Sequence, residues 1–288
     1  MASIVIGAGM MQHPTLDERE KVPDSSAARL AEAARLVREA AWRGCDFLCL
    51  PELFADPSQG LKMREFAEPV GGPVMTWLAR MAAKHRMALV TSVAIRRGRR
   101  VANTGVIFDK RGRLVGRYEK VHLPDGEREV GTPGRQFPAF KVACLPCRAR
   151  HRQEGVRVGM QICHDLNFPE GCRILALKGA DIVVWPNMWG GMPEEHTEVI
   201  MKARAIDNKL CLVSSAYLLT GSGFFRVPKI HGRTCIIDWT GTVVAETGRR
   251  LGVAVAALDL DELHANRLSR EKAFQRERLP RLYGELAG

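Results

Sequence analysis

Residues 156–186, VRVGMQICHDLNFPEGCRILALKGADIVVWP, decide the fold class of this chain. Apolar, β-rich residues predict a strand over 156–162 that ends at Cys163. Helical spacing of apolar residues follows over 169–178 until a glycine, and a second apolar strand runs over 182–185 until a proline closes it. A strand, a helix and a strand in close succession are typical of α/β proteins.

The rest of the chain also alternates strands and helices. Many of its strands form hairpins, which argues against a purely parallel sheet, so a mixed sheet or two sheets fits better. Since no linker rich in proline, glycine or serine divides the sequence, we expect one domain over residues 1–268 and a polar, basic tail over 269–288. The other predicted strands are 3–10, 47–50, 87–95, 101–108, 113–120, 210–217, 232–238, 243–247 and 252–258, and the other predicted helices are 26–43, 73–85, 194–208 and 260–268.

The composition is that of a soluble globular protein, with 46% hydrophobic and 26% charged residues among 288. No apolar run approaches the roughly 20 residues that span a bilayer, and the N-terminus resembles a first strand more than a signal peptide, so we expect no membrane partner. Eight cysteines without a secretory signal favour a reducing, cytoplasmic location. The net charge of +11 favours acidic partners in general, but no aromatic residues interleave the arginine clusters, so we expect no nucleic-acid partner.

Three candidate catalytic residues each stand at the end of an apolar, strand-like run: Glu52, Lys120 and Cys163. A carboxylate, an ammonium group and a thiol supply a base, an electrostatic stabiliser and a nucleophile for acyl transfer. At a strand-to-helix elbow, the helix dipole would favour a thiolate at Cys163, and the backbone N–H of His164 would receive an oxyanion. Each residue alone also has an ordinary explanation, as an inert buried thiol or a surface charge, so the prediction depends on all three meeting in space.

The motifs around these residues, Leu-Pro-Glu-Leu, Tyr-Glu-Lys-Val-His-Leu and Ile-Cys-His-Asp-Leu-Asn-Phe-Pro-Glu, resemble those of the nitrilase, or carbon–nitrogen hydrolase, superfamily in the same order. Supporting matches lie at 103–104, 133–134, 204–208 and 232–238. The resemblance implies a catalytic triad of Glu52, Lys120 and Cys163 in a four-layer α-β-β-α sandwich with two mixed β-sheets. It also implies a homodimer or higher homo-oligomer built through the outer helices, with no cofactor and no metal.

The resemblance further implies a second catalytic glutamate in the loop after the lysine. Glu127 fits the usual spacing, Glu129 stays possible because the loop is short, and both could be solvated loop charges. D-carbamoylases of the family carry a carboxylate-binding arginine pair near the position of Asn167, so an N-carbamoyl-D-amino acid is disfavoured here. Trp189 could line an apolar acyl site or belong to the core. The candidate substrate-binding residues are His164, Asn167 and Trp189.

One further cysteine motif, Cys144-Leu145-Pro146-Cys147, has His151 nearby. It lacks both the second ligand pair of a zinc site and the helix start of a redox motif. We interpret residues 144–157 as a lengthened basic hairpin.

Together these features predict an enzyme that hydrolyses the C–N bond of a small amide or N-carbamoyl compound. The reaction would pass through a cysteine thioester and release ammonia or an amine. A nitrilase acting on a small nitrile is one alternative. A non-catalytic binding protein that keeps the same fold is the other.

Overall fold

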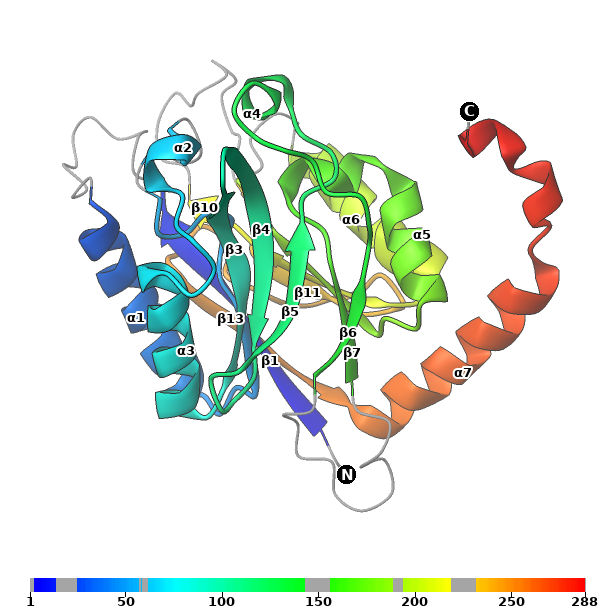
Figure 1. Cartoon of the computed structure of the whole chain (residues 1–288). Coiled ribbons are helices and arrows are strands. Elements are labelled where there is room, and N and C mark those ends of the chain that lie inside the picture. The colour runs from blue at the N-terminus through cyan, green and yellow to red at the C-terminus, as the bar shows by residue number, and fades with distance from the viewer. Residues whose placement is uncertain are drawn as a thin grey trace.

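Two β-sheets lie face to face in the computed structural model, which describes residues 3–13, 25–56, 58, 62–142, 156–188, 194–218 and 232–287. Helices cover the outer face of each sheet (Figure 1). The predicted fold class, a sandwich with two mixed sheets inside, is therefore confirmed.

The first sheet consists of β1 (Ser3–Gln12), β2 (Phe47–Cys49), β3 (Ala88–Arg97), β4 (Arg100–Phe108), β5 (Leu114–Glu119), β10 (Tyr217–Leu218) and β13 (Gly252–Asp259). Its order is β10-β1-β2-β3-β4-β5, and β13 also pairs with β1. The pairs β1–β2 and β2–β3 are parallel, whereas β3–β4, β4–β5 and β1–β13 are antiparallel. The hairpins that the sequence predicts thus lie beside the parallel strands β1, β2 and β3 at the centre of the sheet.

The second sheet consists of β6 (Ala139–Val142), β7 (Val156–Met160), β8 (Ile182–Pro186), β9 (Cys211–Ser215), β11 (Cys235–Ile237) and β12 (Val243–Glu246). Its order is β12-β11-β9-β8-β7-β6, with β7, β8 and β9 parallel and the outer pairs antiparallel. Strand β8 is buried along its whole length, as its unbroken apolar sequence requires.

The helices begin and end where the local sequence dictates. On the first sheet lie α1 (Ser26–Trp42) and α3 (Pro73–His85), and on the second α5 (Pro169–Leu177) and α6 (Glu194–Asn208) (Figure 1). The Ser25 hydroxyl accepts a hydrogen bond from the Ala28 N–H and caps α1. Helix α3 starts at a proline, whose missing N–H costs nothing at that position.

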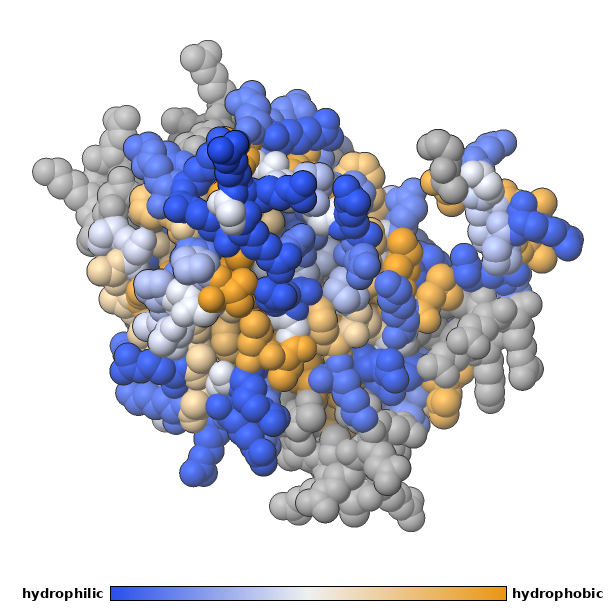
Figure 2. Space-filling model, in the orientation of Figure 1, coloured by the Kyte–Doolittle hydropathy of each residue, from blue (hydrophilic) through white to orange (hydrophobic). Residues whose placement is uncertain are grey.

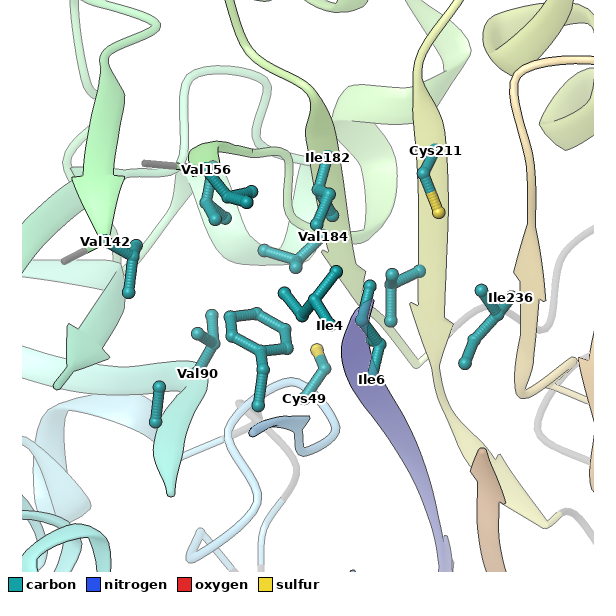
Figure 3. Packing of buried hydrophobic residues seen from close by; sticks show 14 of the residues in the cluster. Ile4, Ile6, Cys49, Val90, Val142, Val156, Ile182, Val184, Cys211 and Ile236 are labelled. Carbon is teal, nitrogen blue, oxygen red and sulfur yellow. The ribbon is translucent and has the colours of Figure 1, made fainter. Parts of the chain in front are cut away.

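The main hydrophobic core lies between the two sheets. Ile4, Ile6 and Val90 of the first sheet point toward Ile182 and Val184 of the second, and all five are fully buried (Figure 3). Two further clusters fill the spaces between each sheet and its helices. The packed inner layer places the loops that follow the strands at one rim of the sandwich.

Two elements differ from the sequence predictions. The single strand predicted over 210–217 is two strands, because the chain leaves the second sheet after β9 and β10 pairs with β1 of the first. The last helix, α7 (Leu260–Glu277), continues past residue 268 because no proline or glycine interrupts it before Pro280. In Figure 1, α7 leads away from the sandwich toward the C-terminus.

Several short elements have no counterpart in the prediction. They are the helices α2 (Met63–Phe66) and α4 (Asp125–Arg128), strand β6, and the 3-10 turns η1 (Cys163–Asn167), η2 (Pro280–Leu282) and η3 (Gly284–Ala287). Within the described ranges, no helix has the length and apolar character needed to cross a membrane.

Candidate active site

Glu52, Lys120 and Cys163 come from three separate strand ends and meet at one rim of the sandwich. Glu52 follows β2, Lys120 directly follows β5, and Cys163 follows β7 after two residues. Lys120 Nζ lies 2.9 Å from Glu52 Oε1, and Glu52 lies close enough to Cys163 for its negative charge to raise the pKa of the thiol. The structure therefore brings all three candidate catalytic side chains into contact.

The backbone around Glu52 is held by side chains of two neighbouring strands. The Thr91 hydroxyl donates to the Pro51 carbonyl at 2.7 Å, and the Tyr217 hydroxyl donates to the carbonyl of Glu52 itself at 2.7 Å. Leu53, the next residue, has a left-handed backbone with φ of 47°, and its N–H donates to the Ser92 hydroxyl. These contacts turn the chain sharply after β2, so the Glu52 side chain points into the site.

The Glu52 carboxylate is 2% exposed and is surrounded by donors. Asn103 Nδ2 donates to Oε1 at 2.8 Å, beside the ammonium group of Lys120, and the Met188 N–H donates to Oε2 at 3.1 Å. Buried carboxylates are stable as anions only when such donors replace water. The arrangement keeps a buried anion next to the thiol.

Glu127 of α4 is the loop glutamate that reaches the lysine. Its Oε2 lies 2.5 Å from Lys120 Nζ, whereas the side chain of Glu129 is exposed. Burial, and then the nearby charge of Glu52, raise the pKa of Glu127, while the ammonium group of Lys120 opposes the rise. Glu127 therefore binds a proton more readily than a solvated glutamate does.

Lys120 carries its positive charge in a fully buried position. Burial alone would lower the pKa of Lys120, but the charges of Glu52, Cys163 and Glu127 outweigh burial and hold the pKa above its ordinary value. The Lys120 backbone is also held on both sides, since its N–H donates to the Asn103 carbonyl and its carbonyl accepts from the Gly134 N–H. A buried ammonium group with two carboxylates is a permanent electrostatic feature of the site.

Cys163 stands at the elbow between β7 and the turn η1. Its backbone is left-handed with φ of 45°, and Trp185 Nε1 donates to its carbonyl at 2.8 Å. Burial, and then the negative charge of Glu52, raise the pKa of the Cys163 thiol, although Lys120 opposes the rise. The thiolate expected from the sequence is thus not the resting form, because burial and the neighbouring anion of Glu52 favour the neutral thiol. Helix α5 starts six residues later, at Pro169.

A buried carboxylate, Asp165, ties the cysteine elbow to the lysine loop. It accepts hydrogen bonds from the Tyr118 hydroxyl at 2.7 Å and from the N–H of Ile162 at 2.9 Å. Its other oxygen lies 2.9 Å from both the backbone N and Nδ1 of His122. Since His122 is two residues beyond Lys120, Asp165 sets the distance between the lysine and cysteine segments.

The three candidate substrate-binding residues have different outcomes. His164 Nδ1 lies 3.1 Å from Asn167 Nδ2, so both face the same side of η1. Burial, and then the charge of Lys120, lower the pKa of His164. The N–H of His164 makes no hydrogen bond with another described residue, so it is free to donate. Trp189 lies outside the described residues.

The structure describes no metal centre. Within the ranges given above, no group of three or more histidine, cysteine, aspartate or glutamate side chains could hold a metal ion. The Cys144 and Cys147 motif and most of the basic segment 144–157 lie outside the described residues.

Sequence patterns assign no role to three residues that hydrogen-bond to Glu52. Asn103 belongs to one of the matching motifs, but its bond to Glu52 depends on the pairing of β2 with β3 and of β3 with β4. Met188 contributes a backbone N–H, which no side-chain pattern reveals. Tyr217 reaches Glu52 because the chain crosses between sheets just before it.

The chain is similar in sequence and in structure to known proteins. The carbon-nitrogen hydrolase family model matches residues 8–267. The 2-oxoglutaramate amidase of Bacillus subtilis is 33% identical over 220 residues, which cover 75% of this chain and 79% of that protein. Citrullinase of Francisella tularensis is 29% identical over 280 residues, covering 91% and 94%. The crystal structure of a carbon-nitrogen hydrolase from Helicobacter pylori has a TM-score of 0.79 at 23% identity, covering 99% and 98% of the two chains, and it supports the fold.

Proposed function

This chain belongs to the carbon–nitrogen hydrolase family and is an amide-hydrolysing enzyme, and on that premise we propose that it cleaves small amides or N-carbamoyl compounds through a thioester on Cys163. One observation carries this mechanism. A single carboxylate, Glu52, contacts both the Cys163 thiol and the Lys120 ammonium group in a buried site. That arrangement provides a nucleophile, its base and a cation within hydrogen-bonding reach of one another.

The first half of the reaction forms the acyl-enzyme. Glu52 takes the thiol proton as the sulfur of Cys163 attacks the carbonyl carbon of the substrate. The negative charge that develops on the carbonyl oxygen is stabilised by Lys120 and by the free N–H of His164. The C–N bond then breaks, and Glu52 returns the proton to the leaving ammonia or amine.

The second half releases the acid. Water donates a proton to Glu52 as its oxygen attacks the thioester carbon. The C–S bond then breaks, and Glu52 passes this proton to the departing sulfur, which restores the thiol and the carboxylate. Glu127 supports binding and positioning. Its Oε1 is buried and has no hydrogen-bond partner within the described part of the chain, so an N–H group of the substrate would satisfy it.

The substrate class is supported by the names of the relatives. One relative is named for 2-oxoglutaramate, which carries a primary amide, and the other for citrulline, which carries a carbamoyl group. Both groups present an sp² carbon bonded to oxygen and to a nitrogen leaving group. The proposed chemistry treats the two alike, and nitriles are included in the test below as the alternative.

The decisive experiment measures ammonia release from a panel of amides, carbamoyl compounds and nitriles. We expect activity on at least one amide or carbamoyl compound, and we expect Cys163→Ala to abolish it. Cys45→Ala is the matched control. Cys45 is a buried thiol that precedes β2, whereas Glu52 follows it, and Cys45 packs between the first sheet and its helices. The pKa of Cys45 is also raised, to about 11. Full amidase activity in Cys163→Ala would refute the mechanism, and activity on nitriles alone would replace the proposed substrate class.

A second experiment separates catalysis from folding. Glu52→Gln keeps the shape of the side chain but cannot accept the thiol proton, so the variant should fold and bind substrate without turnover. Intact-protein mass spectrometry of the wild type with excess substrate should detect an adduct of acyl mass on Cys163 that Cys163→Ala lacks. Turnover by Glu52→Gln at the wild-type rate would exclude this base.

We also propose a homo-oligomer that forms through the outer helices. Val199 and Ile206 of α6 are 66% and 50% exposed, and Leu282 and Leu286 beyond α7 are 66% and 70% exposed. Apolar side chains this exposed favour burial against another surface. Sedimentation of the wild type and of Val199→Asp tests this: the wild type should be a dimer or larger, and the variant should dissociate more readily.

A cytoplasmic location completes the proposal. Its support is that the six described cysteines are free thiols, which a reducing compartment preserves. Cell fractionation with an antibody to the chain is the direct test.

A further inference from the structure

A hollow of about 1150 Å³ lies on the first sheet, and neither Glu52, Lys120 nor Cys163 is among the residues that line it. Strands β4 and β5 form its base, and the segment 132–140 forms one wall. Ile95, which lines the hollow, packs in the same cluster as the helices of this sheet. The hollow also includes Val115, Tyr118 and Phe140, which belong to the core between the sheets or pack against it. It therefore extends around β5, the edge strand of the first sheet (Figure 1). We call it the arginine groove.

Four arginines from three parts of the chain line the arginine groove. Arg97 and Arg100 are paired across β3 and β4, Arg117 lies on β5, and Arg135 lies on the wall segment. One acidic residue, Glu119, lies among the lining residues, and its carboxylate is 3.1 Å from the guanidinium of Arg97. The local charge is therefore strongly positive.

The other three arginines are exposed, with guanidinium groups that are not committed to a neighbour. The side chains of Arg100, Arg117 and Arg135 make no hydrogen bond or ion pair with any residue in the described ranges. Guanidinium groups bind carboxylates and phosphates through paired hydrogen bonds in a fixed plane. Three of them around one hollow can hold an anion with more than one charged group.

The floor of the arginine groove is apolar. Ile95, Ala102, Val115 and Phe140 contribute to it, and Figure 2 shows hydrophobic residues at the centre of this face with hydrophilic ones around them. Gly116 lets the Phe140 ring pack directly against β5, since a Cβ there would lie 2.7 Å from that ring. An occupant would rest a flat or apolar body on this floor while its charged groups face the arginines.

We propose that the arginine groove binds a small organic anion that carries two or more carboxylate or phosphate groups on an aromatic or apolar body. Its volume lies just above the range of roughly 300–1,000 Å³ that small-molecule sites occupy. Arg97 is paired with Glu119, so the positive charges of the other three arginines are available to complement the charges of the anion. The apolar floor distinguishes this ligand from an inorganic ion.

The test is calorimetric titration of the full-length protein with two probes, ADP for the phosphate class and isophthalate for the dicarboxylate class. We expect at least one probe to bind. Arg117→Ala and Arg135→Ala should each weaken that binding by about tenfold or more, as loss of a charge-assisted contact implies. Pyrophosphate carries the phosphate charges but no aromatic or apolar group, so it should bind more weakly than ADP if ADP is the probe that binds.

Controls separate this site from the active site and from general charge. Arg250→Ala removes an exposed arginine outside the groove and should change the affinity less than twofold. Cys163→Ala should also leave the affinity unchanged. Failure of both probes to bind, or equal binding by Arg117→Ala, Arg135→Ala and the wild type, would overturn the proposal.

Two other occupants give distinct outcomes that also overturn it. Binding of hexaglutamate with the same arginine dependence, and of neither small probe, would assign the groove to an acidic protein segment. Self-association that Arg117→Ala abolishes, again with neither probe bound, would assign it to a second copy of the chain.

Discussion

Removing the hydroxyl of Tyr118 tests whether Asp165 holds the two catalytic segments together. The Asp165 carboxylate is fully buried, and four hydrogen-bonding groups surround it. Tyr118→Phe deletes one of these groups and leaves the ring volume almost unchanged, so no cavity forms. Burial, and then the charge of Asp165, raise the pKa of Tyr118, so the hydroxyl keeps its proton to a higher pH than a solvated tyrosine does.

The magnitude follows from the charge of the acceptor. A hydrogen bond to a charged group contributes about 1.5–3 kcal/mol to stability, and a deleted partner leaves part of the carboxylate unsatisfied. We expect Tyr118→Phe to lower the free energy of unfolding by about 2 kcal/mol and the Tm by roughly 4 °C for a chain of this size. Since Asp165 spaces the Lys120 and Cys163 segments, kcat should fall as well.

The assay is guanidinium denaturation of the wild type, of Tyr118→Phe, and of Tyr283→Phe as the matched control. The Tyr283 hydroxyl is on the exposed C-terminal segment and accepts a bond from Leu279 N at 3.2 Å, so its loss should cost under about 0.5 kcal/mol. A double-mutant cycle with Asp165→Asn isolates the interaction. Asp165 does not hold the two segments together through Tyr118 if Tyr118→Phe lowers the free energy of unfolding no more than the control does. An additive double-mutant cycle would lead to the same conclusion.

Three further predictions concern proton binding and charge pairing. Glu127→Gln should fold normally and lower kcat/KM by roughly 10²-fold, as mispositioning of a catalytic group does; steady-state kinetics on the best amide test this, and an unchanged rate would remove Glu127 from the site. The pKa of His13 is lowered from 6.5 to about 4, first by burial and then by Arg29; its contribution to stability is therefore present above pH 6.5 and is lost as the pH falls toward 4. The protein should be about 2 kcal/mol less stable at pH 5 than at pH 7 from this group, and His13→Gln should flatten that part of the curve in denaturation at both pH values. Arg267→Met leaves the buried carboxylate of Asp181 without its Nε and Nη2 partners and should cost about 3–5 kcal/mol in thermal or chemical unfolding; a cost near zero would show that α7 is not anchored through this pair.

Local sequence predicts most of the helices and strands because their boundaries are local events. The helix over 73–85 is bounded by a proline that favours a helix start and by the left-handed Arg86 at its end. The break between β9 and β10 is different, because no proline or glycine marks it. It is caused by pairing with β1 and by the Ser215 hydroxyl, which donates to the Gly9 carbonyl at 2.6 Å. Such a contact depends on residues about 200 positions apart.

The same division applies to the site. Glu52, Lys120 and Cys163 could be nominated because each has a reactive side chain at the end of an apolar run. The donors that complete the Glu52 environment come from a strand register and a backbone N–H, at Asn103 and Met188. Sequence patterns carry no direct information about either. The protonation state of the thiol also depends on that environment, since the raised pKa of Cys163 reflects burial and the Glu52 charge.

The raised pKa of Cys163 is compatible with catalysis when the charge of the whole site is considered. In the resting site, the ammonium group of Lys120 faces the anion of Glu52, and the neighbouring thiol is neutral. When the proton moves from Cys163 to Glu52, one negative charge moves from oxygen to sulfur, and the net charge of the site stays the same. Burial penalises a change in net charge far more than a short displacement of charge beside a fixed cation. In the proposed mechanism, attack on the substrate would then move the same charge onto the substrate oxygen, still within reach of Lys120. In the proposed mechanism, the lysine would lower the barrier because it faces this negative charge throughout the reaction, and the thiolate would need to exist only while the substrate is bound.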